Sequence, residues 1–183
     1  LKVESRSRPD GMRNGDRDFF ALINQGKASI VVDFAKATER AALLRLLATA
    51  DIVIEAARPR ALLQLGIDSA ALVRETPGLI WITITAHGAE GEAANWVGFG
   101  DDCAVAGGLS AALYAASGRA GFVGDAIADP LTGVHAALTA WEAYTTRQGG
   151  RFGLAMSHVV ASCLARARDR DAAALERSLQ RWA

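Results

Sequence analysis

The sequence predicts an α/β fold, a Rossmann-like parallel sheet with helices on both faces. Two observations support this prediction. Short runs rich in β-branched residues, typical of buried strands, alternate along the chain with helical segments. The connections between them are short, and strands that are separated by single helices pair in parallel.

Five segments are expected to form the strands. The first residues, from Leu1 to Glu4, already have the pattern of a strand. Because Leu1 is not a methionine, we expect a domain or fragment whose beginning is missing or lies elsewhere. The other strands contain branched apolar residues between turn residues. The expected strands are residues 1–4, 29–34, 52–54, 79–85 and 154–156.

The helices are expected from apolar periodicity and from the residues that begin or end them. Gly66 is expected to end one short helix, and Asp129-Pro130 to begin the clearest helix of the chain. The expected helices are residues 38–49, 60–65, 69–75, 101–116 and 131–146, with further helix within 151–165. Loops are expected at residues 5–18 and, rich in glycine and alanine, at 87–100; residues 118–124 are expected to form a turn and a short extended piece. We assign residues 1–165 to one domain and residues 166–183 to a charged helical tail.

The composition excludes several classes of function. Twenty basic residues balance twenty acidic ones among 183, so we expect no nucleic-acid partner, which normally needs a basic excess. No apolar stretch approaches the ~20 residues of a membrane span. The two cysteines, Cys103 and Cys163, form neither a disulfide framework nor a zinc pattern, which favours a cytoplasmic location.

Asp129 is the first candidate for chemistry, and two compatible interpretations apply to it. As the residue before Pro130 it has the pattern of a helix N-cap. A carboxylate at that end of a helix is also held ionised by the helix dipole and by free N–H groups. An ionised, oriented carboxylate can act as the nucleophile in acyl transfer.

Other charged residues are weaker candidates. Lys27 is either a solvated turn residue or a contact to a ligand phosphate. Arg58 and Arg60 follow a strand at the edge where α/β sheets bind ligands, and they are either phosphate contacts or residues of a surface turn. The three histidines share no metal-ligand spacing, and the adjacent Asp101 and Asp102 are a weak signal without partners. We therefore expect no metal.

Several blocks occur in order along residues 1–165. They are the opening strand, Phe19 to Asp33 with its Asn24-Gln25-Gly26-Lys27 turn, Ala50 to Glu55 followed by Arg58-Pro59 and Leu65-Gly66-Ile67, Pro77 to Gly88, and Ala128-Asp129-Pro130-Leu131-Thr132-Gly133. Together they resemble the class III CoA-transferases (CaiB/BaiF type), the family of formyl-CoA transferase, carnitine CoA-transferase and α-methylacyl-CoA racemase. Asp129 falls on the family's nucleophile motif.

The resemblance implies an enzyme that moves CoA from an acyl-CoA to a carboxylic acid, usually as an interlocked homodimer. Asp129 would form an acyl anhydride and then an aspartyl-CoA thioester. Coenzyme A would contact residues on the turns and loops of the large domain. By this resemblance the CoA contacts are Asn24, Lys27, Ala56, Arg58, Gln64, Val97, Gly98 and Phe99.

The sequence also departs from the family pattern. Ala56-Ala57 stands where many members carry an asparagine, and Phe99 stands where the racemases need a histidine, so racemisation is the least favoured activity. The family's first strand and its small domain have no counterpart among these 183 residues. A truncated product, one chain of a split enzyme completed by a partner chain, and a non-catalytic CoA-binding or assembly module all remain open.

Overall fold

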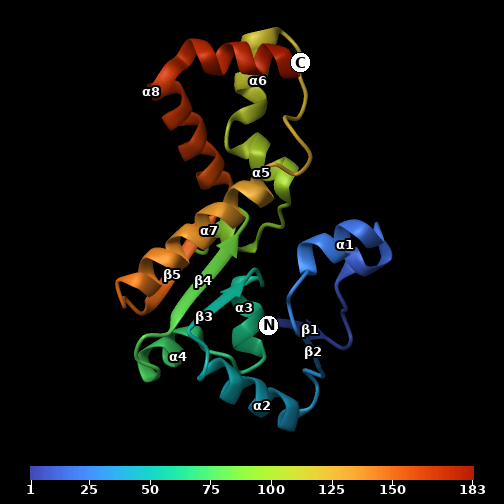
Figure 1. Cartoon of the computed structure of the whole chain (residues 1–183), viewed down its shortest axis with the longest axis vertical. Coiled ribbons are helices and arrows are strands. Elements are labelled where there is room, and N and C mark those ends of the chain that lie inside the picture. Colours follow the sequence, from blue (N-terminus) through green and yellow to red (C-terminus); the bar gives the residue numbers. More distant parts are fainter.

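The computed structural model describes residues 1–183, except for the side chain of residue 59, and has an α/β fold with parallel strands, as predicted (Figure 1). Strand β1 (Lys2–Ser5) pairs with β2 (Ser29–Val32), and β4 (Ile80–Thr85) lies between β3 (Ile52–Glu55) and β5 (Gly150–Ala155). All three pairings are parallel. The strands form two sheets, however, and not the single sheet that we expected.

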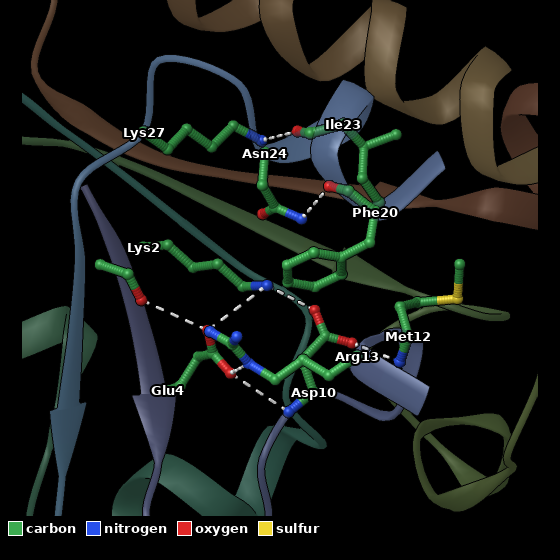
Figure 2. Close-up of polar contacts among 10 residues, drawn as sticks. Lys2, Glu4, Asp10, Met12, Arg13, Phe20, Ile23, Asn24 and Lys27 are labelled. Atoms are coloured by element: carbon green, nitrogen blue, oxygen red, sulfur yellow. Dashed lines mark hydrogen bonds and ion pairs between the residues drawn. The ribbon is translucent and has the colours of Figure 1, made fainter. Parts of the chain in front are cut away.

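The β1–β2 unit is joined to its neighbouring loop by ion pairs. Glu4 of β1, 6% exposed, accepts from Arg13 at 2.6 Å and from Ser29 at 3.3 Å. Arg13 belongs to the 3₁₀ turn η1 (Gly11–Asn14), and Figure 2 shows this network below the phenyl ring of Phe20. Val31 of β2 stays half exposed. The small sheet is therefore stabilised by local polar contacts.

Strand β4 is the centre of the larger sheet, and its alternate residues face opposite sides. Ile80 and Ile82 pack against helix α7 (Ala128–Thr145), on three small residues at helical spacing, Ala136, Ala140 and Ala143. On the other face Trp81 packs with Leu43 of α2 (Ala37–Leu47). Both faces of β4 are covered by helices, and this fixes α7 against the sheet.

The remaining short helices are α1 (Arg17–Asn24), α3 (Pro59–Gln64), α4 (Ser69–Glu75), α5 (Gly100–Ala106) and α6 (Leu109–Ser117). The prediction of one helix over 101–116 was wrong, because Gly108 adopts a φ of +89° and separates α5 from α6. The expected loops contain η1 and η2 (Glu92–Asn95). The expected extended piece within 118–124 forms no strand; residues 119–122 have no regular structure, and 118, 123 and 124 are bends.

Helix α8 (Met156–Trp182) contains the charged tail. It bends at Asp171, which has φ −164° and ψ 92° and whose Oδ1 accepts from the Ala174 N–H at 2.9 Å. The segment after the bend returns to α6, where Gln180 donates to the Ala116 carbonyl, and α6 and α8 lie together at one end of the molecule (Figure 1). The division of the chain at residue 165 stays a prediction. Among the described residues, no helix has the length and apolar character needed to span a bilayer.

Candidate active site

A cavity of about 440 Å³ lies at the ends of β3 and β4, beside the first two turns of α7. The carboxyl ends of parallel strands are where α/β sheets bind ligands. The loop between β4 and α5 forms the opposite wall, and Met156, the first residue of α8, also contributes. The lining includes six of the nine predicted site residues: Ala56, Arg58, Val97, Gly98, Phe99 and Asp129.

Asp129 lies in the first turn of α7, and the prediction that it caps this helix was wrong. The helix begins at Ala128, after Ile127, whose backbone is already helical with φ −57° and ψ −26°. The chain reverses just before, at Ala126, which has a positive φ of 49°. The backbone N–H of Asp129 donates to the Ala126 carbonyl at 2.9 Å. The carboxylate therefore stands inside the first helical turn, at the cavity wall.

Gly100 brings the start of α5 against the Asp129 carboxylate. A Cβ at Gly100 would overlap both Asp129 Oδ2 and the carbonyl oxygen of Ala126. Gly98 is equally confined, since its Cβ would lie 2.6 Å from the Ala86 Cβ and 2.9 Å from Cys103 Sγ. Only glycine allows the backbone to approach this closely, which gives both glycines a structural role beside the cavity.

The pKa of Asp129 is raised above its ordinary value, chiefly by burial. A hydrogen bond from the Gly100 N–H acts in the opposite direction, and the negative charges of Asp101 and Asp102 raise the pKa further. Position at a helix N-terminus alone would have lowered it. Burial thus outweighs the effect of the helix end, and the Asp129 carboxyl keeps its proton to a higher pH than a solvated aspartate does.

Asn24 and Lys27 lie at the end of α1, and their polar groups are engaged there. Asn24 Nδ2 donates to the Phe20 carbonyl at 2.9 Å, and Lys27 Nζ donates to the Ile23 carbonyl at 2.7 Å (Figure 2). Neither residue is among the described residues that line the cavity, nor is the exposed Gln64. The structure thus brings six predicted residues together and leaves these three outside.

Sequence reasoning missed several residues in the cavity lining and close to it. Thr132 lies three residues after Asp129, and this helical spacing was the available signal. Trp96, 56% exposed, packs edge-on against His87 with ring centroids 5.8 Å apart. Asp101 accepts a hydrogen bond from the Ala126 N–H, a contact between segments 25 residues apart that no local pattern reveals.

Three side chains near the cavity could hold a metal ion. Among the described residues, His87, Asp102 and Cys103 place one potential ligand atom each within 4.8 Å of one another. Cys103 is fully buried, and burial, with the nearby charges of Asp102 and Asp129, raises its pKa to about 11. Because the thiol is protonated at neutral pH, a metal ion would have to displace this proton to bind it.

The sequence of the chain is similar to that of known CoA-transferases. The profile described as CoA-transferase family III matches residues 1–168. A succinyl-CoA–D-citramalate CoA-transferase of Chloroflexus aurantiacus is 30% identical over 155 residues, 81% of this chain and 39% of that protein. A succinate–glutarate CoA-transferase of Agrobacterium fabrum is 34% identical over 119 residues, 64% of this chain and 29% of that protein.

Solved structures agree with the sequence matches. The crystal structure of a CAIB/BAIF family protein from Brucella suis superposes with a TM-score of 0.80 at 28% identity, and covers 94% of this chain and 49% of that chain. A hypothetical protein from Mycobacterium tuberculosis gives a TM-score of 0.79 at 25% identity, with 92% and 50% covered. The chain therefore spans about half the length of these solved chains and less than half of the curated relatives. By sequence and by fold, the chain belongs to CoA-transferase family III.

Proposed function

We propose that this chain is part of an enzyme that transfers CoA from an acyl-CoA to a carboxylic acid through Asp129. The observation that supports the proposal most directly is the convergence of Asp129, Arg58 and the Val97–Phe99 segment on one cavity at the strand ends. These residues come from three separate parts of the sequence. Independent of this convergence, the chain belongs to CoA-transferase family III.

The proposed reaction needs no oxidant and no external proton donor. An Asp129 oxygen attacks the thioester carbonyl carbon, a C–O bond forms, and the C–S bond breaks to release CoA thiolate and leave an acyl-aspartyl anhydride. The thiolate then attacks the aspartyl carbonyl of the anhydride, which releases the donor acid as a carboxylate. The acceptor carboxylate repeats these two steps in reverse order, which yields the new acyl-CoA and free Asp129.

The cavity suits the reactive end of an acyl-CoA. Much of its wall is apolar, including Ile84, Ala86 and Met156, and an apolar wall restricts water around a hydrolysable anhydride. Arg58 is exposed and belongs to the cavity lining, and we assign it to a CoA phosphate. We assign Ala56, Val97, Gly98 and Phe99 to the thioester side. By resemblance we also retain Asn24, Lys27 and Gln64 as contacts to the rest of CoA.

Exposed apolar side chains and free thiols bear on the assembly and location of the protein. Ile54 and Trp141 are 55% and 63% exposed, so apolar surface remains for a second copy of the chain or for another segment that completes the fold. We infer a homodimer or a partner chain, in the cytoplasm, where acyl-CoA and free carboxylic acids are available together. Both cysteines are free thiols, which suits a reducing compartment.

The direct test is covalent trapping. The purified chain is incubated with acetyl-, succinyl- and longer acyl-CoA thioesters, and intact mass and peptide mass are recorded. We expect a mass increment on the peptide that contains Asp129, and none in Asp129→Asn, which keeps the size of the side chain. Asp125→Asn, with an exposed carboxylate on the same segment, serves as the matched control and should leave the adduct unchanged.

Measurement of CoA binding distinguishes a CoA-transferase from a non-catalytic CoA-binding module. Tight CoA binding without an adduct from any thioester would favour a non-catalytic CoA-binding module and would reject acyl transfer by this chain. Lys27→Ala tests the predicted contact, and we expect it to weaken CoA binding several-fold. Lys36→Ala, an exposed lysine that pairs with Glu39 on α2, is the control.

A further inference from the structure

The hydroxyl of Thr132 is buried and has no hydrogen-bond partner. Thr132 is 1% exposed, and among the described residues its Oγ1 and the Trp81 Nε1 are the buried side-chain atoms without a partner. Trp81 belongs to the core on the α2 side of the sheet, whereas Thr132 lines the cavity. An unpaired hydroxyl in a protein interior is unfavourable and calls for an explanation.

The position of Thr132 relative to Asp129 points to a ligand. Residues three apart on a helix lie on the same face, so Thr132 stands one turn along α7 from the carboxylate. Thr132 is also more deeply buried than Asp129, which is only partly covered at the cavity wall. Gly133, the next residue, presents no side chain to the cavity.

The other threonine of the cavity is already satisfied. Thr85 Oγ1 donates to the Leu154 carbonyl and accepts from the Gly88 N–H at 3.1 Å. A threonine in a helix commonly bonds the carbonyl three or four residues earlier, but Thr132 does not make this bond. Its hydroxyl is therefore left without a protein partner, on a residue that belongs to the cavity wall.

We propose that Thr132 donates a hydrogen bond to the carbonyl oxygen of the acyl-CoA thioester that Asp129 attacks; this inference rests on the proposed function. As the new C–O bond forms, the carbonyl oxygen gains negative charge, and a fixed donor stabilises it more strongly than it stabilises the substrate. The C–S electron pair leaves with the CoA thiolate, and Thr132 keeps its proton throughout. Thr132 is thus a second catalytic residue beside Asp129.

Two inert analogues of acetyl-CoA test this contact without turnover. In one, a methylene group replaces the thioester sulfur, so the carbonyl is retained as a ketone. In the other, an S-ethyl thioether, the carbonyl is absent. We expect the wild-type chain to bind the ketone about five- to tenfold more tightly, the contribution of one hydrogen bond. Thr132→Val exchanges the hydroxyl for a methyl group of similar size. This variant should bind the ketone and the thioether with about equal affinity.

Thr132→Ser and the melting temperature distinguish catalysis from a structural role. Thr132→Ser keeps a hydroxyl and should keep most of the preference for the ketone. Thr132→Val should retain or raise the melting temperature, because it removes an unpaired buried hydroxyl. The rate of adduct formation on Asp129 should fall about tenfold or more in Thr132→Val.

Each outcome bears on one proposal or on both. A wild-type adduct together with equal ketone preference in wild type and Thr132→Val would overturn the role of Thr132 and leave acyl transfer by Asp129 standing. A wild-type chain that forms no adduct and does not prefer the ketone overturns both. A lower melting temperature in Thr132→Val with unchanged ketone preference would show that Thr132 is a packing residue only.

Discussion

Asp101 Oδ1 accepts a hydrogen bond from the backbone N–H of Ala126 at 2.9 Å. This contact joins the first turn of α5 to the reversal that precedes α7. Ala126 holds a positive φ of 49°, an unfavourable conformation for a residue with a Cβ. The Ala126 carbonyl in turn accepts from the Asp129 N–H. Asp101 therefore stabilises the turn from which the proposed nucleophile projects.

We predict that Asp101→Ala slows the formation of the Asp129 adduct about 10- to 100-fold, the effect of a misplaced reacting group. Binding of CoA itself should change little, because Asp101 lies outside the cavity lining. Asp101→Asn retains the acceptor oxygen and should keep the rate within severalfold. Equal loss of rate in both variants would indicate that the charge, and not the hydrogen bond, matters.

The pH dependence of the Asp101→Asn variant gives a second test. Because the charge of Asp101 raises the pKa of Asp129, its removal in Asp101→Asn should lower this pKa. The carboxylate is the nucleophile, so the acid limb of the pH–rate profile should move to lower pH. Rates of adduct formation between pH 3 and pH 8, measured by quenched mass spectrometry, provide the profile. A shift toward higher pH would contradict the assignment of Asp129.

Gly100→Ala should destabilise the chain by about 1–3 kcal/mol, the usual effect of an overpacked site. The new methyl group would overlap Asp129 Oδ2 and the Ala126 carbonyl, so the start of α5 or α7 must move. Gly133→Ala is the matched control. No atom lies within 4 Å of a Cβ there, and alanine in a helix interior should add about 0.5–1 kcal/mol. Urea unfolding of the wild type, Gly100→Ala and Gly133→Ala measures the expected loss of stability in the first variant and the expected gain in the second.

The fold was largely predictable, because its strands and helices follow from local patterns. The branched residues of β4 and the alanines of α7 predicted a strand and a helix where the structure has them. The separation of the strands into two sheets was not predictable in this way. It depends on which strand edges pair in the folded chain, and no periodicity of the sequence reveals that pairing.

The candidate site was predictable only in part. The motif around Asp129 and the Val97–Phe99 segment were recognised by their order in the sequence, and both line the cavity. The start of α7 was misplaced because Ala126 carries no sequence signal for a positive φ. Thr132 was missed because burial without a hydrogen-bond partner is a property of the folded chain, and residue type does not reveal it.

Glu4 should make the stability of the chain depend on acid pH. The hydrogen bond from Arg13, the largest contribution, lowers its pKa from 4.5 to about 2. A carboxyl with a lowered pKa in the folded state stabilises the fold above pH 4.5, and this contribution disappears as the pH falls through about 2. The difference in melting temperature between wild type and Glu4→Gln should therefore be constant from pH 8 to pH 5 and shrink below pH 4.5. Glu75→Gln, on an exposed side chain, should show no such trend.

The two thiols should differ sharply in reactivity. Cys103 is fully buried, its Sγ donates to the Ala86 carbonyl at 3.6 Å, and its pKa is raised to about 11, so almost no thiolate is present at pH 8. Cys163 is partly exposed, with its Sγ 3.4 Å from His135 Nε2. Iodoacetamide at pH 8 should therefore alkylate Cys163 in the folded chain and Cys103 only after unfolding in guanidinium, as read by peptide mass. Early alkylation of Cys103 in the folded wild-type chain would contradict its burial behind the cavity wall.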